Sequence, residues 1–340
     1  MSMLEKICRK LYNISVLFPL EFVKSKFARQ NGTLLRKYPS NPEDFDFTEQ
    51  EAANYIYERL NSKKPLMISR FGSVELDAIN MCLALKEKSI CKRIKNFIED
   101  KYDDFMFSQS KIAALKNNAG FFDADRKKLD LFTDLYLKSM TDIDILGSWH
   151  YKEKYVSQYL PIDVKKIPLW FLEPYFFDKP AWSRVLTGKK VLVVHPFTET
   201  IKKQYKKRDK LFHNPDILPI FELKTIKAVQ TIAGETTNFN SWFDALEYMK
   251  NEISKVVDFD ICIIGCGAYG LPLASYVKSL GKQAIHLGGA TQILFGIRGK
   301  RWEEGYGTEF YQKMMNEYWV RPSIDEIPKN KNLVEEGCYW

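Results

Sequence analysis

The sequence has few cysteines and few histidines, and their spacing excludes several kinds of site. Six cysteines and four histidines are scattered through 340 residues. No two cysteines form a C-x-x-C pair, which argues against a zinc site and against a disulfide framework. The pattern is typical of reduced thiols in a cytoplasmic protein. The cysteines are Cys8, Cys82, Cys91, Cys262, Cys266 and Cys338.

Long apolar runs are also missing. No stretch of about 18 apolar residues occurs, so the sequence predicts no transmembrane helix. A cleavable signal peptide is not expected either, because Asn13, Ser15 and Pro19 interrupt the apolar part of the N-terminal segment. Repeats and low-complexity tracts are absent. The hydrophobic fraction of 45% and the charged fraction of 28% are typical of a globular protein with one large or two ordinary domains.

The charge is positive and is spread along the chain, although one basic run, KKQYKKRDKLFHN, occupies residues 202–214. The net charge of +8 favours an anionic partner such as a nucleotide or a lipid headgroup. This spread argues against a nucleic-acid-binding arm, so no nucleic-acid partner is expected. Basic and apolar residues alternate over residues 1–30. This segment could contact an anionic membrane as a peripheral anchor, or it could be an ordinary helix packed on the domain.

The order of predicted elements indicates an α/β fold. Strands and helices alternate from Leu66 to Leu287, which predicts a largely parallel, doubly wound, Rossmann-like sheet flanked by helices. We expect a helical N-terminal extension over 1–48 and a single domain over 49–320, followed by a tail over 321–340. The domain divides into two Rossmann-like halves, at about 49–160 and 161–305. The predicted strands are Leu66–Ser69, Ile143–Leu146, Ile167–Leu172, Val191–Val194, Ile220–Thr225, Ile261–Ile264 and Gln283–Leu287.

A glycine-rich turn follows the strand Ile261–Ile264. Gly265, Gly267 and Gly270 form a G-x-G-x-x-G pattern before a predicted helix, and Gly288 and Gly289 follow the next strand. Such glycines let backbone amides approach a phosphate or a sugar at a helix start. A dinucleotide fingerprint also needs an acid at the end of the second strand, and none is present. The alternative is a tight turn with close helix–strand packing.

The segment Phe295–Trp302, FGIRGKRW, places three cations among glycines and aromatic residues. Arg298, Lys300 and Arg301 could clamp a diphosphate, and Trp302 could stack on a base or a sugar. The alternative is a solvated basic loop.

Polar residues follow several predicted strands. Arg70, Phe71 and Gly72 lead into a helix for which Ser73 is the predicted N-cap, with Glu75 in its first turn. Glu75 could bind Mg²⁺ or Mn²⁺ together with substrate phosphates, or it could simply complement the helix dipole. Because parallel strands end at one rim, a further set of residues could converge there as general bases or as structural groups. These are His150, Glu173, His195 and Glu199.

The run from Arg70 to Glu75, together with the late stretch GCGAYGLPLA…GKQAIHLGGATQILFGIRGKRW, resembles the GT-D type glycosyltransferase domain. The resemblance covers roughly Pro65 to Trp302. It implies a nucleotide-sugar donor and a role in bacterial glycan assembly. The D-x-E motif of that family, used for metal and donor binding, falls on Ser73, Val74 and Glu75, so that serine replaces the aspartate.

These observations predict a hexosyltransferase or related enzyme. It would move a sugar, with UDP as the expected nucleotide, to a glycan or lipid-linked acceptor in surface polysaccharide assembly, in the cytoplasm or at the inner face of the membrane. Glu75 with a divalent cation, and the cluster Arg298–Arg301, would stabilise the leaving group. Two alternatives stay open: a Rossmann-type methyltransferase or NAD-dependent enzyme, and a non-catalytic scaffold for polysaccharide assembly.

Overall fold

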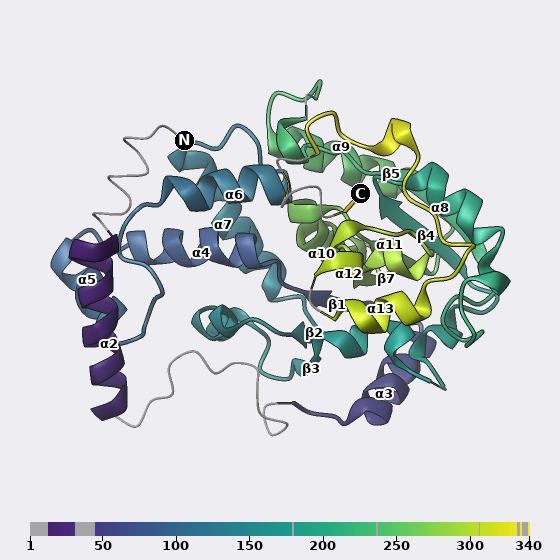
Figure 1. Cartoon of the computed structure of the whole chain (residues 1–340), viewed down its shortest axis with the longest axis horizontal. Coiled ribbons are helices and arrows are strands. Elements are labelled where there is room, and N and C mark those ends of the chain that lie inside the picture. Colours follow the sequence, from purple (N-terminus) through teal and green to yellow (C-terminus); the bar gives the residue numbers. More distant parts are fainter. Residues whose placement is uncertain are drawn as a thin grey trace.

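A seven-stranded sheet forms the centre of the protein (Figure 1). The computed structural model describes residues 13–30, 45–178, 180–235, 237–305, 307–331, 334 and 339–340. The strand order is β3-β2-β1-β7-β6-β4-β5, and every neighbouring pair is parallel. The predicted parallel, doubly wound sheet is therefore confirmed. The strands are β1 Leu66–Arg70, β2 Ile145–Ser148, β3 Lys165–Pro168, β4 Lys190–His195, β5 Glu222–Lys227, β6 Ile261–Ile264 and β7 Gln283–His286.

The inner strands are buried on both faces, which explains their short apolar sequences. All four residues of β6 are buried, as expected where helices cover both faces of a parallel sheet. Because successive side chains point to opposite faces, β4 contributes Val191 and Val193 to one core cluster and Leu192 and Val194 to the other.

Helices cover each face of the sheet (Figure 1). Side chains of α4 Ser73–Leu85, α6 Gln109–Ala119, α7 Arg126–Met140, α9 Trp242–Lys255 and α10 Gly270–Ser279 pack in one core cluster. The other cluster contains side chains of α3 Glu49–Asn61, α8 Thr198–Tyr205, α11 Ala290–Leu294, α12 Lys300–Glu304 and α13 Thr308–Met314. The helix α2 Phe18–Gln30, preceded by a π-helical turn at Asn13–Leu17, contacts α5 Ile90–Ile98 at one end of the molecule. Short 3-10 turns occupy Tyr151–Tyr155, Ser157–Tyr159, Leu169–Leu172, Pro174–Phe176, Trp182–Leu186, Arg208–Lys210, Ile232–Gly234, Gly267–Tyr269 and Ile324–Glu326.

Several boundaries differ from the sequence prediction. The strands predicted over Ile143–Leu146 and Ile220–Thr225 each lie two residues later, at Ile145–Ser148 and Glu222–Lys227. The strand predicted over Ile167–Leu172 ends at Pro168, and a 3-10 turn replaces its last four residues. This turn brings the Leu172 side chain over the bare backbone of Gly147 on β2, where a Cβ would lie 2.3 Å from Leu172 Cδ1. The first helix after β1 is capped by Gly72, so Ser73 is its first residue and not its cap.

The first and the last strand of the chain, β1 and β7, lie side by side in the middle of the sheet. β1 lies between β2 and β7, and β7 in turn pairs with β6. The carboxyl ends of all the strands share one rim, which is where α/β proteins bind their ligands. No helix in the described part of the chain is long and apolar enough to cross a membrane. Most of the predicted extension, residues 1–12 and 31–44, lies outside the described residues.

Candidate functional site

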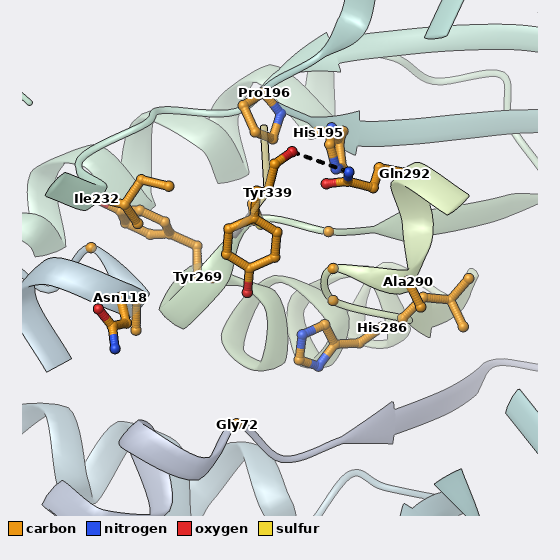
Figure 2. A pocket seen from close by; sticks show the side chains of 18 of the residues that line it. Gly72, Asn118, His195, Pro196, Ile232, Tyr269, His286, Ala290, Gln292 and Tyr339 are labelled. Atoms are coloured by element: carbon orange, nitrogen blue, oxygen red, sulfur yellow. Dashed lines mark hydrogen bonds between the residues drawn. The ribbon is translucent and has the colours of Figure 1, made fainter. Parts of the chain in front are cut away.

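A cavity of about 560 Å³ opens at the carboxyl rim of the sheet. Its volume lies within the range usual for small-molecule sites, about 300–1,000 Å³. Residues at or just beyond the end of every strand line it. In strand order from β1 to β7, these include Arg70, Trp149, Glu173, His195, Val229, Gly265 and His286. Figure 2 shows several of the lining residues, including Gly72, His195 and His286.

Glu75 is held over the start of α4. Gly72 is extended at the N-cap, and a Cβ added there would lie 1.9 Å from Glu75 Oε2. Only glycine therefore leaves room for this carboxylate, which is 8% exposed. Burial raises the pKa of Glu75, while its own backbone N–H and the positive charge of Arg70 act in the opposite direction. The family motif position thus carries a buried carboxylate at the cavity wall.

Arg70 lies between aromatic and acidic groups. Its guanidinium carbon is 5.1 Å from the centre of the Trp149 ring, and Trp149 Nε1 donates to the carbonyl of Phe71 at 2.9 Å. Burial lowers the pKa of Arg70, and the carboxylates of Glu75 and Glu173 oppose that shift. Gly288, with φ +63°, lies close enough that a Cβ would come within 3.4 Å of Arg70 Nη1. Arg70 is therefore fixed at the junction of β1 and β7.

Glu173 follows β3 and is tuned to titrate near neutrality. Burial raises its pKa to about 7, against the hydrogen bond from Tyr175, the charge of Arg70 and a hydrogen bond from Tyr311. Tyr175 and Tyr311 both donate to Oε2, the latter at 3.4 Å. A carboxylate with such a pKa suits general-base catalysis near neutral pH.

The two histidines of the cavity are buried and neutral. Burial lowers the pKa of His195 to about 3, and burial with the charge of Arg70 does the same for His286. His195 Nδ1 accepts the Phe197 N–H at 3.0 Å, so the proton of the neutral ring resides on Nε2. His286 Nδ1 lies 3.0 Å from Ser69 Oγ. Both rings can donate or accept hydrogen bonds, whereas Glu173 is better suited to take up a proton near neutral pH.

The glycines of the G-x-G-x-x-G turn allow close backbone packing, and some of them also line the cavity. A Cβ at Gly265 would lie 2.6 Å from the Gly288 carbonyl, and Gly267, with φ +57°, faces the Ala119 carbonyl at the same distance. The backbones of both glycines also line the cavity, as do those of Gly288 and Gly289. Gly270 is different, because a Cβ there would meet His286 Nε2 at 2.2 Å and it is not among the described lining residues.

The segment Phe295–Trp302 reaches the cavity with only some of its polar side chains. Arg301 and Trp302 line the cavity. Arg298 Nη2 instead donates to the Asn316 carbonyl at 2.7 Å, and Lys300 Nζ lies 3.7 Å from Glu304 Oε2. The three predicted cations therefore do not form one clamp in the described structure. Arg301 and Arg70 are the arginines that share the cavity.

Three other predicted residues lie outside the described lining. Phe71 is 2% exposed and belongs to the core. Glu199 is exposed on α8 and pairs with Lys202 at 2.8 Å. His150 caps the turn Tyr151–Tyr155 with its ring. Asp77, close to Glu75 in sequence, pairs with Lys152 instead of facing the cavity.

Several lining residues have no role in the sequence interpretation. Trp149 follows β2, so its position at the strand end was a usable signal. Tyr339 and Trp340 come from the far end of the sequence and had no local signal. Figure 2 shows the Tyr339 ring among the lining side chains, with its carbonyl accepting from Gln292 Nε2 at 3.2 Å. Its hydroxyl accepts from Arg301 Nη1 at 3.1 Å.

The described residues hold no group of three or more His, Cys, Asp or Glu side chains that could bind a metal. Ser73 and Glu75 both line the cavity, so a hydroxyl and one carboxylate are available at the motif. This donor set fits a divalent cation only if substrate phosphates supply further ligands, which is the usual arrangement for Mg²⁺.

The parallel sheet and the charged cavity at its carboxyl rim define an α/β protein whose candidate ligand site lies at the strand ends. The chain belongs to the GT-D fold-like domain family, whose model matches residues 47–294. This membership confirms the resemblance seen in the sequence and supports the class of glycosyltransferases.

Two solved structures of a domain of unknown function 1792 are similar to this chain. One, a selenomethionine-substituted structure, is 12% identical with a TM-score of 0.36. The other, described as having a distinct glycosyltransferase fold, is 14% identical with a TM-score of 0.35. Each comparison covers 82% of this chain and 91% of the other. No curated protein matches the sequence.

Proposed function

We propose that this protein transfers a hexose or related sugar from a nucleotide-sugar donor, with UDP as the nucleotide, to a hydroxyl of a glycan or lipid-linked acceptor. The observation that carries the proposal is the shared cavity of Arg70, Arg301, Glu75 and Glu173 at the strand ends. Two arginines match the charge of a diphosphate. Of the two carboxylates, one is available to hold a divalent cation and the other to accept the proton of the acceptor hydroxyl. The expected setting is bacterial surface polysaccharide assembly in the cytoplasm or at the inner face of the membrane.

The donor would bind across the junction of β1 and β7. Arg70 and Arg301 would contact its phosphates, and the cavity-lining backbone of Gly288 and Gly289 would approach the ribose or the phosphates. Trp302 and Trp149 offer aromatic surface for the base or the sugar. The pocket therefore offers separate surfaces to the charged and the planar parts of a nucleotide sugar.

Transfer would proceed as a single displacement. The acceptor oxygen forms a bond to the anomeric carbon, and the bond from that carbon to the phosphate oxygen breaks. The electron pair leaves with the nucleoside diphosphate, whose charge Arg70 and Arg301 stabilise. The acceptor proton passes to the Glu173 carboxylate, whose pKa of about 7 makes it the best matched base in the cavity.

A divalent cation, Mn²⁺ or Mg²⁺, would add charge stabilisation at the phosphates when bound. Glu75 would hold it, with the Ser73 hydroxyl beside it. The remaining ligands would come from the donor and water.

The alternatives fit less well. A nicotinamide or methyl-donor cofactor would need an acid at the end of the strand after the glycine turn. That strand, β7, ends at His286, and the lining carboxylates Glu75 and Glu173 follow β1 and β3. A non-catalytic scaffold has less reason to gather two arginines and two carboxylates around one cavity, and one of these carboxylates, Glu173, has a pKa raised by burial at a cost in stability.

The test is the thermal stability of the protein with UDP, UDP-sugars, adenosylmethionine and NAD, each with and without Mn²⁺. A ligand at a hundred times its dissociation constant stabilises the folded state by about 2.7 kcal/mol. We expect a shift with UDP compounds that Glu75→Ala reduces and the surface control Glu199→Ala does not. A shift with adenosylmethionine or NAD alone would replace the proposal, and no shift with any ligand would favour the scaffold.

A further inference from the structure

The helix α2 turns an apolar side away from the described part of the protein. Phe18 is 69% exposed, Phe22 56%, Val23 44% and Phe27 38%. The buried positions of α2 are Lys24 and Ala28. A helix packed on a globular domain normally buries its apolar stripe and exposes its charges. Here the pattern is reversed.

A specific ion pair fixes this orientation. Lys24 is 7% exposed, and its Nζ lies 2.8 Å from Asp100 Oδ1 and 4.5 Å above the centre of the Phe97 ring. Burial raises the pKa of Asp100, but hydrogen bonds from Lys154, Lys24 and Tyr155 together lower it below its usual value. Rotating α2 to bury its phenylalanines would leave Asp100 without Lys24 and expose the pocket that receives it. The outward apolar face is therefore built into the packing.

The charges on the outward side of α2 are positive. Lys26 and Arg29 are exposed, and the Lys26 ammonium lies 4.8 Å from the centre of the Phe22 ring. The acid of this helix, Glu21, is half-buried and lines the small cavity beside Lys24. Exposed aromatic side chains next to cations on one side of a helix are the composition of a segment that lies in a membrane interface.

The position of α2 suits such contact. It lies with α5 at one end of the molecule, away from the central sheet and its rim (Figure 1). The predicted membrane segment spans 1–30, of which 1–12 lie outside the described residues.

We propose that α2 docks on an anionic lipid bilayer, with Phe18 and Phe22 entering the headgroup region and with Lys26 and Arg29 contacting lipid phosphates. The charge complementarity selects an anionic surface over a neutral one. The proposal does not depend on the transferase assignment, since no residue of the cavity takes part. It gives the chain a means of concentrating at a membrane.

The experiment is co-sedimentation of the full chain with vesicles of phosphatidylcholine alone and of phosphatidylcholine mixed with phosphatidylglycerol. The wild type is expected to bind the anionic vesicles and to be released at high salt, where the screening length falls to about 3 Å. The double variant Phe18→Ser/Phe22→Ser should bind about tenfold or more weakly. Ile162→Ser/Ile324→Ser is the matched control, because these side chains are 106% and 80% exposed but lie elsewhere.

A second variant separates charge from apolar contact. Lys26→Gln/Arg29→Gln should weaken binding to anionic vesicles and remove most of its salt dependence. Absence of wild-type binding, equal binding to neutral vesicles, or full binding by the phenylalanine variant would each overturn the proposal. Gel filtration tests the alternative that a second copy of the chain covers this face. If the wild type is a dimer and the phenylalanine variant is a monomer, the face is a dimer interface and the membrane proposal is overturned. All four substituted α2 side chains are exposed, so unchanged thermal midpoints are expected.

Discussion

Replacing Glu173 by glutamine should remove activity and at the same time stabilise the fold above neutral pH. For activity, the wild-type kcat/KM should fall about tenfold per pH unit as pH drops below about 7, because the base must be ionised. Glu173→Gln should lower kcat/KM by about 10²–10⁴ and make it independent of pH in this range. The assay is UDP release during donor hydrolysis, in which water takes the place of the acceptor hydroxyl.

The stability effect follows from the same pKa. The folded protein keeps the Glu173 proton up to pH about 7, whereas an unperturbed glutamate loses it near 4.5. Between these values the folded state binds more protons than the unfolded state, so stability falls as pH rises. At about 1.4 kcal/mol per pH unit, the ionised side chain costs about 3 kcal/mol above neutrality. Glutamine removes this cost while its carbonyl oxygen keeps the Tyr175 and Tyr311 hydroxyls as donors.

Urea unfolding of both proteins measures this difference. Glu173→Gln should be more stable by about 1 kcal/mol at about pH 5 and by about 3 kcal/mol at about pH 8. Glu199→Gln is the control, because that exposed residue pairs with Lys202 on its own helix and should change neither quantity by much. A variant that keeps wild-type kcat/KM would refute the base assignment. A stability gap that does not grow with pH would refute the raised pKa.

Three further substitutions distinguish residues that affect ligand binding from residues that affect stability. Gly72→Ala should displace the Glu75 carboxylate, because the new Cβ would lie 1.9 Å from Oε2. We expect UDP binding, measured by calorimetry, to weaken at least tenfold. The free energy of unfolding should fall by only about 1 kcal/mol. Gly270→Ala should act on stability instead, losing about 1–3 kcal/mol in urea unfolding, because the new Cβ would fall 2.2 Å from the buried His286 ring. Arg301→Gln should weaken UDP binding by about tenfold or more, the usual loss for a hydrogen bond to a charged group, with an unchanged unfolding midpoint.

The sheet could be predicted from sequence because its signals are local. Short apolar runs such as Ile261–Ile264, each bounded by a turn, indicate buried strands. The rule that parallel strands end at one rim then selected Glu173 and His195, and both line the cavity. The same rule selected Glu199 and His150, which do not. Side-chain direction beyond a strand end depends on the turn that follows, and no local pattern specifies it.

The remaining features depend on contacts between distant segments. The position of Tyr339 against Gln292 and Arg301 depends on tertiary packing, so no local sequence motif predicts it. The alternation of basic and apolar residues in α2 indicated an amphipathic helix but not which side faces outward. That choice is made by Asp100, far along the chain, which receives Lys24.

The central place of β7 has a consequence for how the protein is made. Ser69 and His286 touch across the β1–β7 pair although 217 positions separate them. Until β7 is synthesised, the strand order leaves two separate three-stranded sheets, β3-β2-β1 and β6-β4-β5, with β1 and β6 presenting open edges. Insertion of β7 closes both edges at once and brings Arg70 beside Gly288. Contacts of such high sequence separation form slowly. We therefore expect the nascent chain to lack the complete cavity and to be most prone to aggregate before β7 has been synthesised.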